Sequence, residues 1–216
     1  MSPENLAAVE ERVRAFEARA GVEAVAAVVE RSDRYHGLRW RAFAAGASVA
    51  ALIAVVADLL RPDWTGAHVA IVTAVTILAA GLACALLATF SRSFERLFLQ
   101  RERAEAEARQ RAKALFLERE LFATADRTAV LLFASRYERV AVIVGDRGYD
   151  GRVSEGEWES IVAAMTAHFR SGNAAAAFAE GLDTLEALLA EKGFRGDGTA
   201  RNVLPDRPIE LGGDDR

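Results

Sequence analysis

Two long apolar stretches interrupt a chain whose other segments alternate apolar and charged positions. They are Ala42–Leu60, with the single charge Asp58 near its end, and Val69–Phe90, with no charged residue over 22 positions. A helix of about 19 residues spans roughly 28 Å, close to the hydrocarbon thickness of a bilayer. The pattern predicts a transmembrane hairpin over residues 40–90. The alternative, two buried helices of a soluble core, is disfavoured because so short a chain has too little other material to cover both.

Arginines flank this hairpin on the side of the two chain ends. Arg31, Arg34, Arg39 and Arg41 precede the first stretch, and Arg92, Arg96, Arg101 and Arg103 follow the second. The connecting loop has only Arg61, beside Asp63, and Trp40 and Trp64 stand where interfacial aromatic residues belong. The positive-inside rule therefore predicts a multi-pass plasma-membrane protein with both termini and the soluble domain in the cytoplasm and Pro62–Gly66 outside.

The flanking segments read as helices and short strands. Helical spacing is seen over Pro3–Ala20, from Ala114 onwards, from Ser154 and over Ala174–Lys192; apolar strand-like runs are Val22–Val29, Ala129–Ala134 and Val140–Val144. The first two strands are joined by a long crossover and should be parallel. The second and third are joined by only five residues and should be antiparallel. We expect an α/β fold: a small mixed sheet covered by helices, with the hairpin inserted after the first strand.

This order divides the chain into five parts. Residues 1–35 and 114–194 are the two parts of one domain, and 40–90 is the membrane hairpin with spans at 42–60 and 69–90. Residues 91–113 are expected to be a helical stalk, which is solvated over the Ala, Glu, Arg and Gln-rich segment Arg101–Lys113. Residues 195–216, rich in Gly, Pro and Asp, are expected to be a flexible tail.

Composition narrows the function classes. The net charge is −4, and the chain has no basic stripe with interleaved aromatics, so we expect no nucleic-acid partner. A single cysteine, Cys84, excludes an intramolecular disulfide and a four-thiolate metal site within one chain.

Several segments together resemble the TPM domain, a family named for thylakoid-lumen, photosystem II repair and acetylcholine-receptor accessory proteins. They are Glu17–Val29, Thr128–Phe133, Tyr137–Gly148, Trp158 with Phe169–Gly172, and Leu204–Leu211. With the membrane hairpin, the chain resembles a group of bacterial membrane proteins. Asp146-Arg147-Gly148 is the most specific element, whereas Ala129 and Gly193-Phe194 depart from the usual pattern. The resemblance implies weak phosphatase activity, calcium binding, or a role in membrane-protein repair or assembly.

The segment from Asp146 to Glu157 approaches the pattern of a calcium loop. Asp146, Asp150 and Glu157 occupy positions one, five and twelve, and Gly151 occupies position six. Gly148 stands at position three, where a ligand belongs, and a strand precedes the loop instead of a helix. The alternative is a strand-to-helix turn in which Asp146 bonds to local backbone amides.

Charged pairs should also meet at one end of the sheet. Asp126 and Arg127 precede the second strand, and Asp146 and Arg147 follow its antiparallel neighbour. Here Asp126 and Asp146, with Asp150, are candidates to hold Ca or Mg for phosphate-ester hydrolysis, and Arg127 and Arg147 are candidates to bind an anionic ligand. The alternative is a structural salt-bridge network.

Ser135, Glu138, Arg139 and Asp33 lie at the opposite end, where they are expected to close the hairpin between strands. Ser135 has no histidine at a suitable spacing, so a serine hydrolase is not indicated.

The leading hypothesis is a noncatalytic, membrane-anchored TPM-like module. It would bind a protein partner in the membrane during assembly, repair or quality control, and could oligomerise. The alternative is a weak metal-dependent phosphatase. A transporter subunit is a third and poorer hypothesis, since the chain has two spans and one carboxylate at a span end.

Overall fold

The computed structural model describes residues 1–33, 35, 37–60, 66–124, 126–194, 204 and 207–211. Two compact units are formed: Met1–Asp33 with Arg101–Arg216 (unit 1), and Arg34–Gln100 (unit 2). Unit 1 is thus built from two separate pieces of chain, and unit 2 is the insertion between them. Several sequence-based expectations fall outside the described residues: those on Arg34, Arg61, Asp63, Trp64, most of the Pro62–Gly66 loop and most of the tail.

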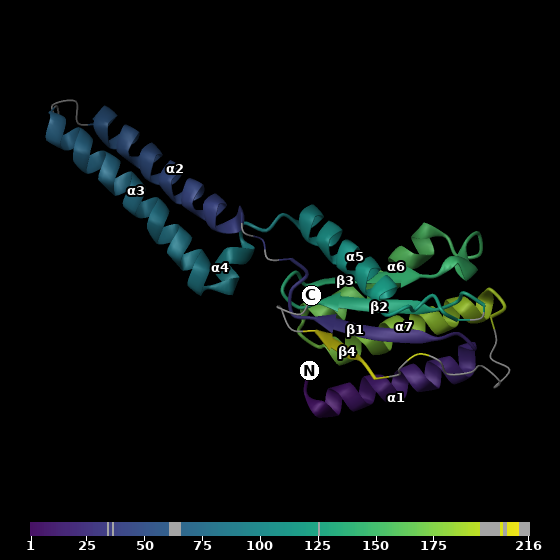
Figure 1. The fold of residues 1–216 in the computed structure, drawn as a ribbon. Helices are drawn as coiled ribbons and strands as arrows, with labels where there is room; N and C mark the ends of the chain where they lie inside the picture. Colours follow the sequence, from purple (N-terminus) through teal and green to yellow (C-terminus); the bar gives the residue numbers. More distant parts are fainter. Residues whose placement is uncertain are drawn as a thin grey trace. The chain divides into compact units, whose positions relative to one another are not determined.

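Unit 1 is built around a four-stranded sheet in the order β3-β2-β1-β4 (Figure 1). The strands are β1 (Ala24–Val29), β2 (Val130–Ser135), β3 (Val140–Gly145) and β4 (Ile209–Leu211). β1 and β2 are parallel, and β2 and β3 are antiparallel. The predicted small mixed sheet is therefore confirmed.

The short strand β4 was not predicted. Ile209–Leu211 pairs in parallel with Ala27–Val29 of β1, and the Leu204 amide donates to the Glu23 carboxylate at 2.9 Å. Part of the segment expected to be a flexible tail thus belongs to the sheet. Three residues give too little alternation to be recognised as a strand, and the pairing depends on β1, nearly two hundred positions away in sequence.

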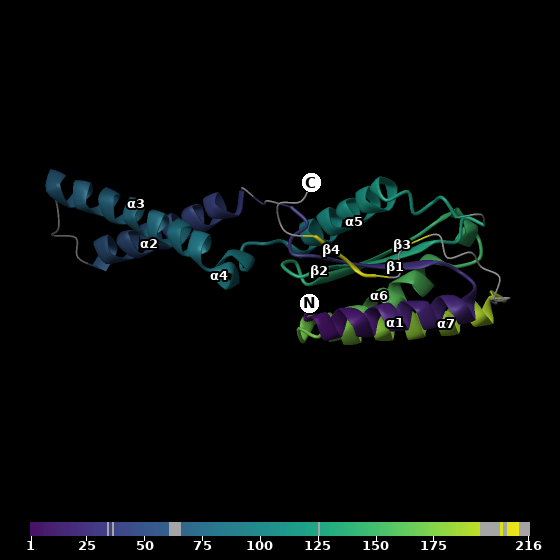
Figure 2. The same cartoon turned by 60° about the horizontal axis from the view of Figure 1, so that its bottom comes forward.

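Helices cover both faces of the sheet. α1 (Pro3–Ala20), α6 (Glu155–Arg170) and α7 (Ala174–Glu191) lie on one face, and α5 (Arg101–Glu118) lies on the other (Figure 2). Successive strand residues point to opposite faces. Accordingly, one core includes Ala24, Ala26, Val28, Val130 and Leu132, and the other includes Val25, Ala27, Val29, Leu131 and Phe133.

The expected stalk over 91–113 differs from the structure. α3 ends at Phe90, a short helix α4 spans Arg92–Arg96, and α5 begins at Arg101. α5 buries Ala104, Ala108 and Ala112, and it packs on β2 and β3. Ala108 and Ala112 belong to the second core. Alanines four apart share one face of a helix and let its backbone approach the sheet closely. The charged residues around this stripe suggested a solvated helix, and the stripe itself was overlooked.

Unit 2 contains a pair of helices, α2 (Gly37–Leu60) and α3 (Ala67–Phe90), which pack along each other (Figure 1). Their contact depends on glycine: a Cβ on Gly46 would lie 2.6 Å from the Cys84 sulfur, and one on Gly81 would lie 2.9 Å from the Phe43 ring. Cys84 is a packing residue at this contact.

Both helices are long and apolar enough to cross a membrane. Within the most apolar 18-residue window, 0% of α2 and 6% of α3 is buried. A core helix of a soluble protein would instead be mostly covered. Large apolar side chains face outwards along both helices, among them Leu52, Ile53, Val56, Leu59, Ile71, Val75, Leu78 and Leu82.

Candidate functional site

The predicted charged residues meet at the end of the sheet where β1 and β2 begin and β3 ends. The strand register aligns Ala24 with Val130, and Val130 with Gly145. Arg127 and Asp146 flank this row and form a bidentate ion pair, with Nε to Oδ2 at 2.7 Å and Nη2 to Oδ1 at 2.9 Å. Asp146 Oδ1 also accepts the Arg147 amide at 2.7 Å. The Asp146 carboxylate therefore accepts three hydrogen bonds.

These contacts set the charge of the pair. Burial raises the pKa of Asp146, but hydrogen bonds from Arg127 and from the Arg147 amide lower it by more in total, so the net shift is downward. The hydrogen bond to Asp146 likewise raises the pKa of Arg127. Both groups are charged at neutral pH. The stabilisation from Asp146 is present above its ordinary pKa and is lost as the pH falls through its lowered one.

Backbone contacts fix the loop after β3 onto the segment before β2. The Gly148 amide donates to the Arg127 carbonyl at 2.8 Å, and the Tyr149 hydroxyl donates to the Thr128 carbonyl. A Cβ on Gly148 would lie 2.6 Å from that same Arg127 oxygen. Arg127 and Asp146 thus pair above a close backbone crossing that only glycine permits. This arrangement matches the structural salt-bridge alternative.

The three proposed calcium ligands do not come together in one site. Asp146 is paired with Arg127, whereas Glu157 closes the capping box of α6 with Ser154 and pairs with the Lys192 ammonium at 2.6 Å. Hydrogen bonds from Lys192 and then from Ser154 lower the pKa of Glu157 to about 2. Asp150 is exposed. Among the described residues, no three His, Cys, Asp or Glu side chains are placed to hold a metal ion, and the calcium interpretation is unsupported.

The remaining candidates at this end are exposed. Asp126 and Arg147 both lie on the surface of unit 1. Asp126 immediately precedes Arg127 in sequence, and its backbone carbonyl lies close to Gly148. The backbone amide of Arg147 donates to Asp146. Arg147 itself is exposed.

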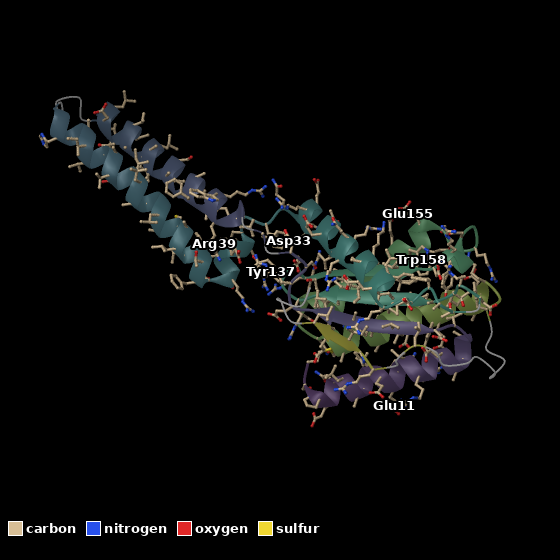
Figure 3. The ribbon with its side chains drawn as sticks, viewed as in Figure 1. Glu11, Asp33, Arg39, Tyr137, Glu155 and Trp158 are labelled. Carbon is tan, nitrogen blue, oxygen red and sulfur yellow. The ribbon has the colours of Figure 1, made fainter. Side chains whose placement is uncertain are left out.

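A second polar cluster closes the opposite end of the sheet, after β1 and β2. The Ser135 hydroxyl, fully buried, donates to the Glu138 carboxylate, whose other oxygen accepts the Ser32 amide at 2.9 Å. The Arg31 guanidinium stacks on the Tyr137 ring at 4.2 Å. Figure 3 shows Tyr137 at this end of unit 1, with Trp158 toward the other end.

Glu138 thereby links the ends of two parallel strands. Sequence reasoning placed Ser135 and Glu138 here but did not recognise that one carboxylate bonds both strand ends. The serine–x–x–glutamate spacing was the available signal. The buried Ser135 hydroxyl already donates a hydrogen bond to a carboxylate and is not an accessible nucleophile. This cluster is therefore structural.

Comparison with known proteins identifies the domain. A family model described as the TPM domain matches residues 94–188, from α4 to the last turns of α7. This part of the chain is similar to the TPM domain. The matched part includes the Arg127–Asp146 pair, β2 and β3, whereas α1, β1 and the apolar helix pair lie before the matched residues of the TPM domain.

The solved structure of the BA42 protein from the psychrophilic bacterium Bizionia argentinensis is similar in fold. The two are 14% identical, the match covers 98% of this chain and 95% of BA42, and the TM-score is 0.59. A likeness at this identity supports the fold alone. The comparison with curated proteins gives no match.

Proposed function

We propose that the protein is a membrane-anchored TPM module that binds a protein partner in the membrane, during assembly, repair or quality control of that partner. One observation carries the proposal. Two exposed apolar helices leave the TPM-containing unit after β1 and return to it before α5. Burying their outward side chains in lipid would hold unit 1 at the membrane surface, where a membrane protein is within reach.

Orientation belongs to the same proposal. The arginines on the chain-end side of α2 and α3 favour the plasma membrane of a bacterium, with both termini and unit 1 in the cytoplasm. A membrane-impermeant maleimide tests this on intact cells, after Cys84 is replaced by alanine. Gly66→Cys, between the two helices, should be labelled, whereas Ser2→Cys should react only after the membrane is opened. The reverse labelling would contradict the orientation.

A binding role fits the candidate site better than hydrolysis does. Asp146 is fully engaged by Arg127 and a backbone amide, and Glu157 is engaged by a helix cap and Lys192. Metal-dependent phosphoryl transfer needs carboxylates free to hold the ion. We therefore expect no hydrolysis of a phosphomonoester above that of an Asp146→Asn control, with or without added Ca or Mg. Hydrolysis that is lost in Asp146→Asn, while the variant remains folded, would favour the phosphatase.

Partner binding is tested by crosslinking in intact membranes. The full chain is compared with a control in which residues 34–100 are replaced by a short flexible linker. A membrane protein that is enriched with the full chain and depleted with the soluble control would support the proposal. The absence of any protein enriched with the full chain would count against it.

A further inference from the structure

The strand β3 forms one edge of the sheet and has an unpaired side. The Asp146 amide donates to the Ala129 carbonyl on the β2 side, and β2 and β3 are antiparallel. Backbone groups alternate in direction along a strand, so those of Val140, Val142 and Val144 also face β2. The amides and carbonyls of Ala141, Ile143 and Gly145 face away from it. In the described part of the chain, no hydrogen bond to these three residues from outside the sheet is found.

β3 lacks the charge and the proline that commonly protect an edge against strand addition. β3 is six residues long, Val-Ala-Val-Ile-Val-Gly, without charge or proline. The opposite edge is different: β4 has three residues, and its Glu210 holds the ammonium of Met1. Natural sheets block their edges with short strands, charges or proline. β3 is the edge that can accept another strand.

The charges at the two ends of β3 indicate what kind of strand fits. Arg139, in the turn before β3, immediately precedes the strand, and Arg147, the first residue of a short 3-10 helix, follows it by two residues. Both residues are exposed. Antiparallel pairing of two copies centred on Ile143 would bring the end of β3 that carries Arg139 next to the end of the second copy that carries Arg147, at both ends of the strand pair. Like charges placed opposite each other destabilise a strand pair. A second copy of this chain is therefore a poor occupant of the edge, and a strand with a carboxylate at each end is a good one.

We propose that β3 binds an extended segment of the partner protein as an added strand, and that Arg139 and Arg147 select a segment with acidic residues at both ends. Ile143 and Gly145, which are more exposed than Ala141, supply most of the backbone hydrogen bonds, and the arginines pair with carboxylates at the two ends of the added strand. The inference rests on the proposed binding function and adds the site and the class of ligand. Such strand addition derives affinity from the main chain and specificity from the flanking side chains.

The test uses the full chain in detergent micelles and a labelled nine-residue probe peptide. The probe has glutamate at positions one and nine with alternating threonine and valine between them; a matched probe has lysine at both ends. Fluorescence anisotropy should show about tenfold tighter binding of the glutamate probe, as expected for two partly exposed charge pairs. The double variant Arg139→Glu, Arg147→Glu should reverse this preference. Arg170→Glu, an exposed arginine on α6, should leave it unchanged.

Two further measurements locate the binding site. N-methylation of one alternate set of probe amides should abolish binding, whereas methylation of the other set should retain it, because only one side of the probe faces β3. Hydrogen exchange at the amides of Ala141, Ile143 and Gly145 should slow at least tenfold with the glutamate probe bound.

Equal binding of the two probes, equal effects of the two methylation patterns, or unchanged exchange at these three amides would each overturn the inference. If the chain still crosslinked a membrane partner in that case, the binding function would stand and the docking site would lie elsewhere. If no partner were crosslinked either, both proposals would fail.

Discussion

Gly148 allows the Asp146-Arg147-Gly148 turn to cross closely over the segment before β2. Replacing Gly148 therefore tests whether this turn is a structural crossing or a calcium-binding loop. A Cβ at this position would lie 2.6 Å from the Arg127 carbonyl oxygen, 2.7 Å from Thr128 Cγ2 and 2.9 Å from the Asp126 carbonyl oxygen. Carbon–oxygen contacts normally begin at about 3.3 Å. Gly148→Ala therefore requires a backbone shift of about 0.7 Å at a point held by the hydrogen bond from Gly148 to Arg127.

Overpacking of this kind costs about 1–3 kcal/mol. For a domain of about 150 residues, each kcal/mol lowers the melting temperature by about 2–4 °C. The measurement is thermal unfolding of the protein in which a short flexible linker replaces residues 34–100, followed by circular dichroism. Gly156→Ala is the control, because a Cβ there meets no atom within 4 Å and α6 should gain slightly from alanine.

The decisive variant is Gly148→Asp. If the loop bound calcium, this change would supply the carboxylate that position three lacks, and calcium would raise the melting temperature. The structure leads us to expect the same loss of stability as in Gly148→Ala, without recovery in calcium. A Gly148→Ala protein as stable as Gly156→Ala, or a calcium-stabilised Gly148→Asp protein, would refute the reasoning.

Two further predictions concern Lys192 and Gly46. Lys192→Met should raise the pKa of Glu157 from about 2 toward its ordinary value, and NMR of the glutamate carboxyl carbons would measure the change. Because the folded-state pKa is lowered, the stabilisation from Glu157 is lost as the pH falls from about 4.5 to about 2. The variant should therefore lose less stability than the unchanged protein over this interval. An unchanged pKa would show that Lys192 does not hold the carboxylate. Gly46→Leu should loosen the packing of α2 on α3, because a Cβ at this position would lie 2.6 Å from the Cys84 sulfur and 2.9 Å from the Ala80 carbonyl oxygen. The Cys84 thiol should then react faster with a maleimide than in the outward-facing control Ile53→Leu. Equal rates in the two variants would contradict the packing of α2 on α3.

The sheet was predictable because its signals are local. Val22–Val29 and the two later apolar runs are short and bounded by turn residues, and the five-residue connector between β2 and β3 permits only an antiparallel hairpin. The capping box at Ser154 was also visible from spacing and is present in the structure. The two features that the sequence did not reveal depend on partners distant in sequence. β4 needs β1, and the burial of α5 becomes evident only when the sheet beneath its alanine stripe is known.

The candidate site shows the same division. Sequence reasoning brought Arg127 and Asp146 to the same end of the sheet, and they form an ion pair there. It could not show that this pair fully engages Asp146, nor that Lys192, from the end of α7, engages Glu157. Spacing within a loop identifies carboxylates, but their availability depends on cations supplied by other elements.

Two pieces of chain, on either side of an apolar hairpin, complete one folded unit. Asp33, before the insertion, and Arg103, after it, approach to 3.8 Å between carboxylate and guanidinium, so a short linker can join the two pieces. With a short flexible linker replacing residues 34–100, we expect a protein that is soluble without detergent and unfolds in a single cooperative transition. A product that requires detergent, or that shows no cooperative unfolding, would contradict the account.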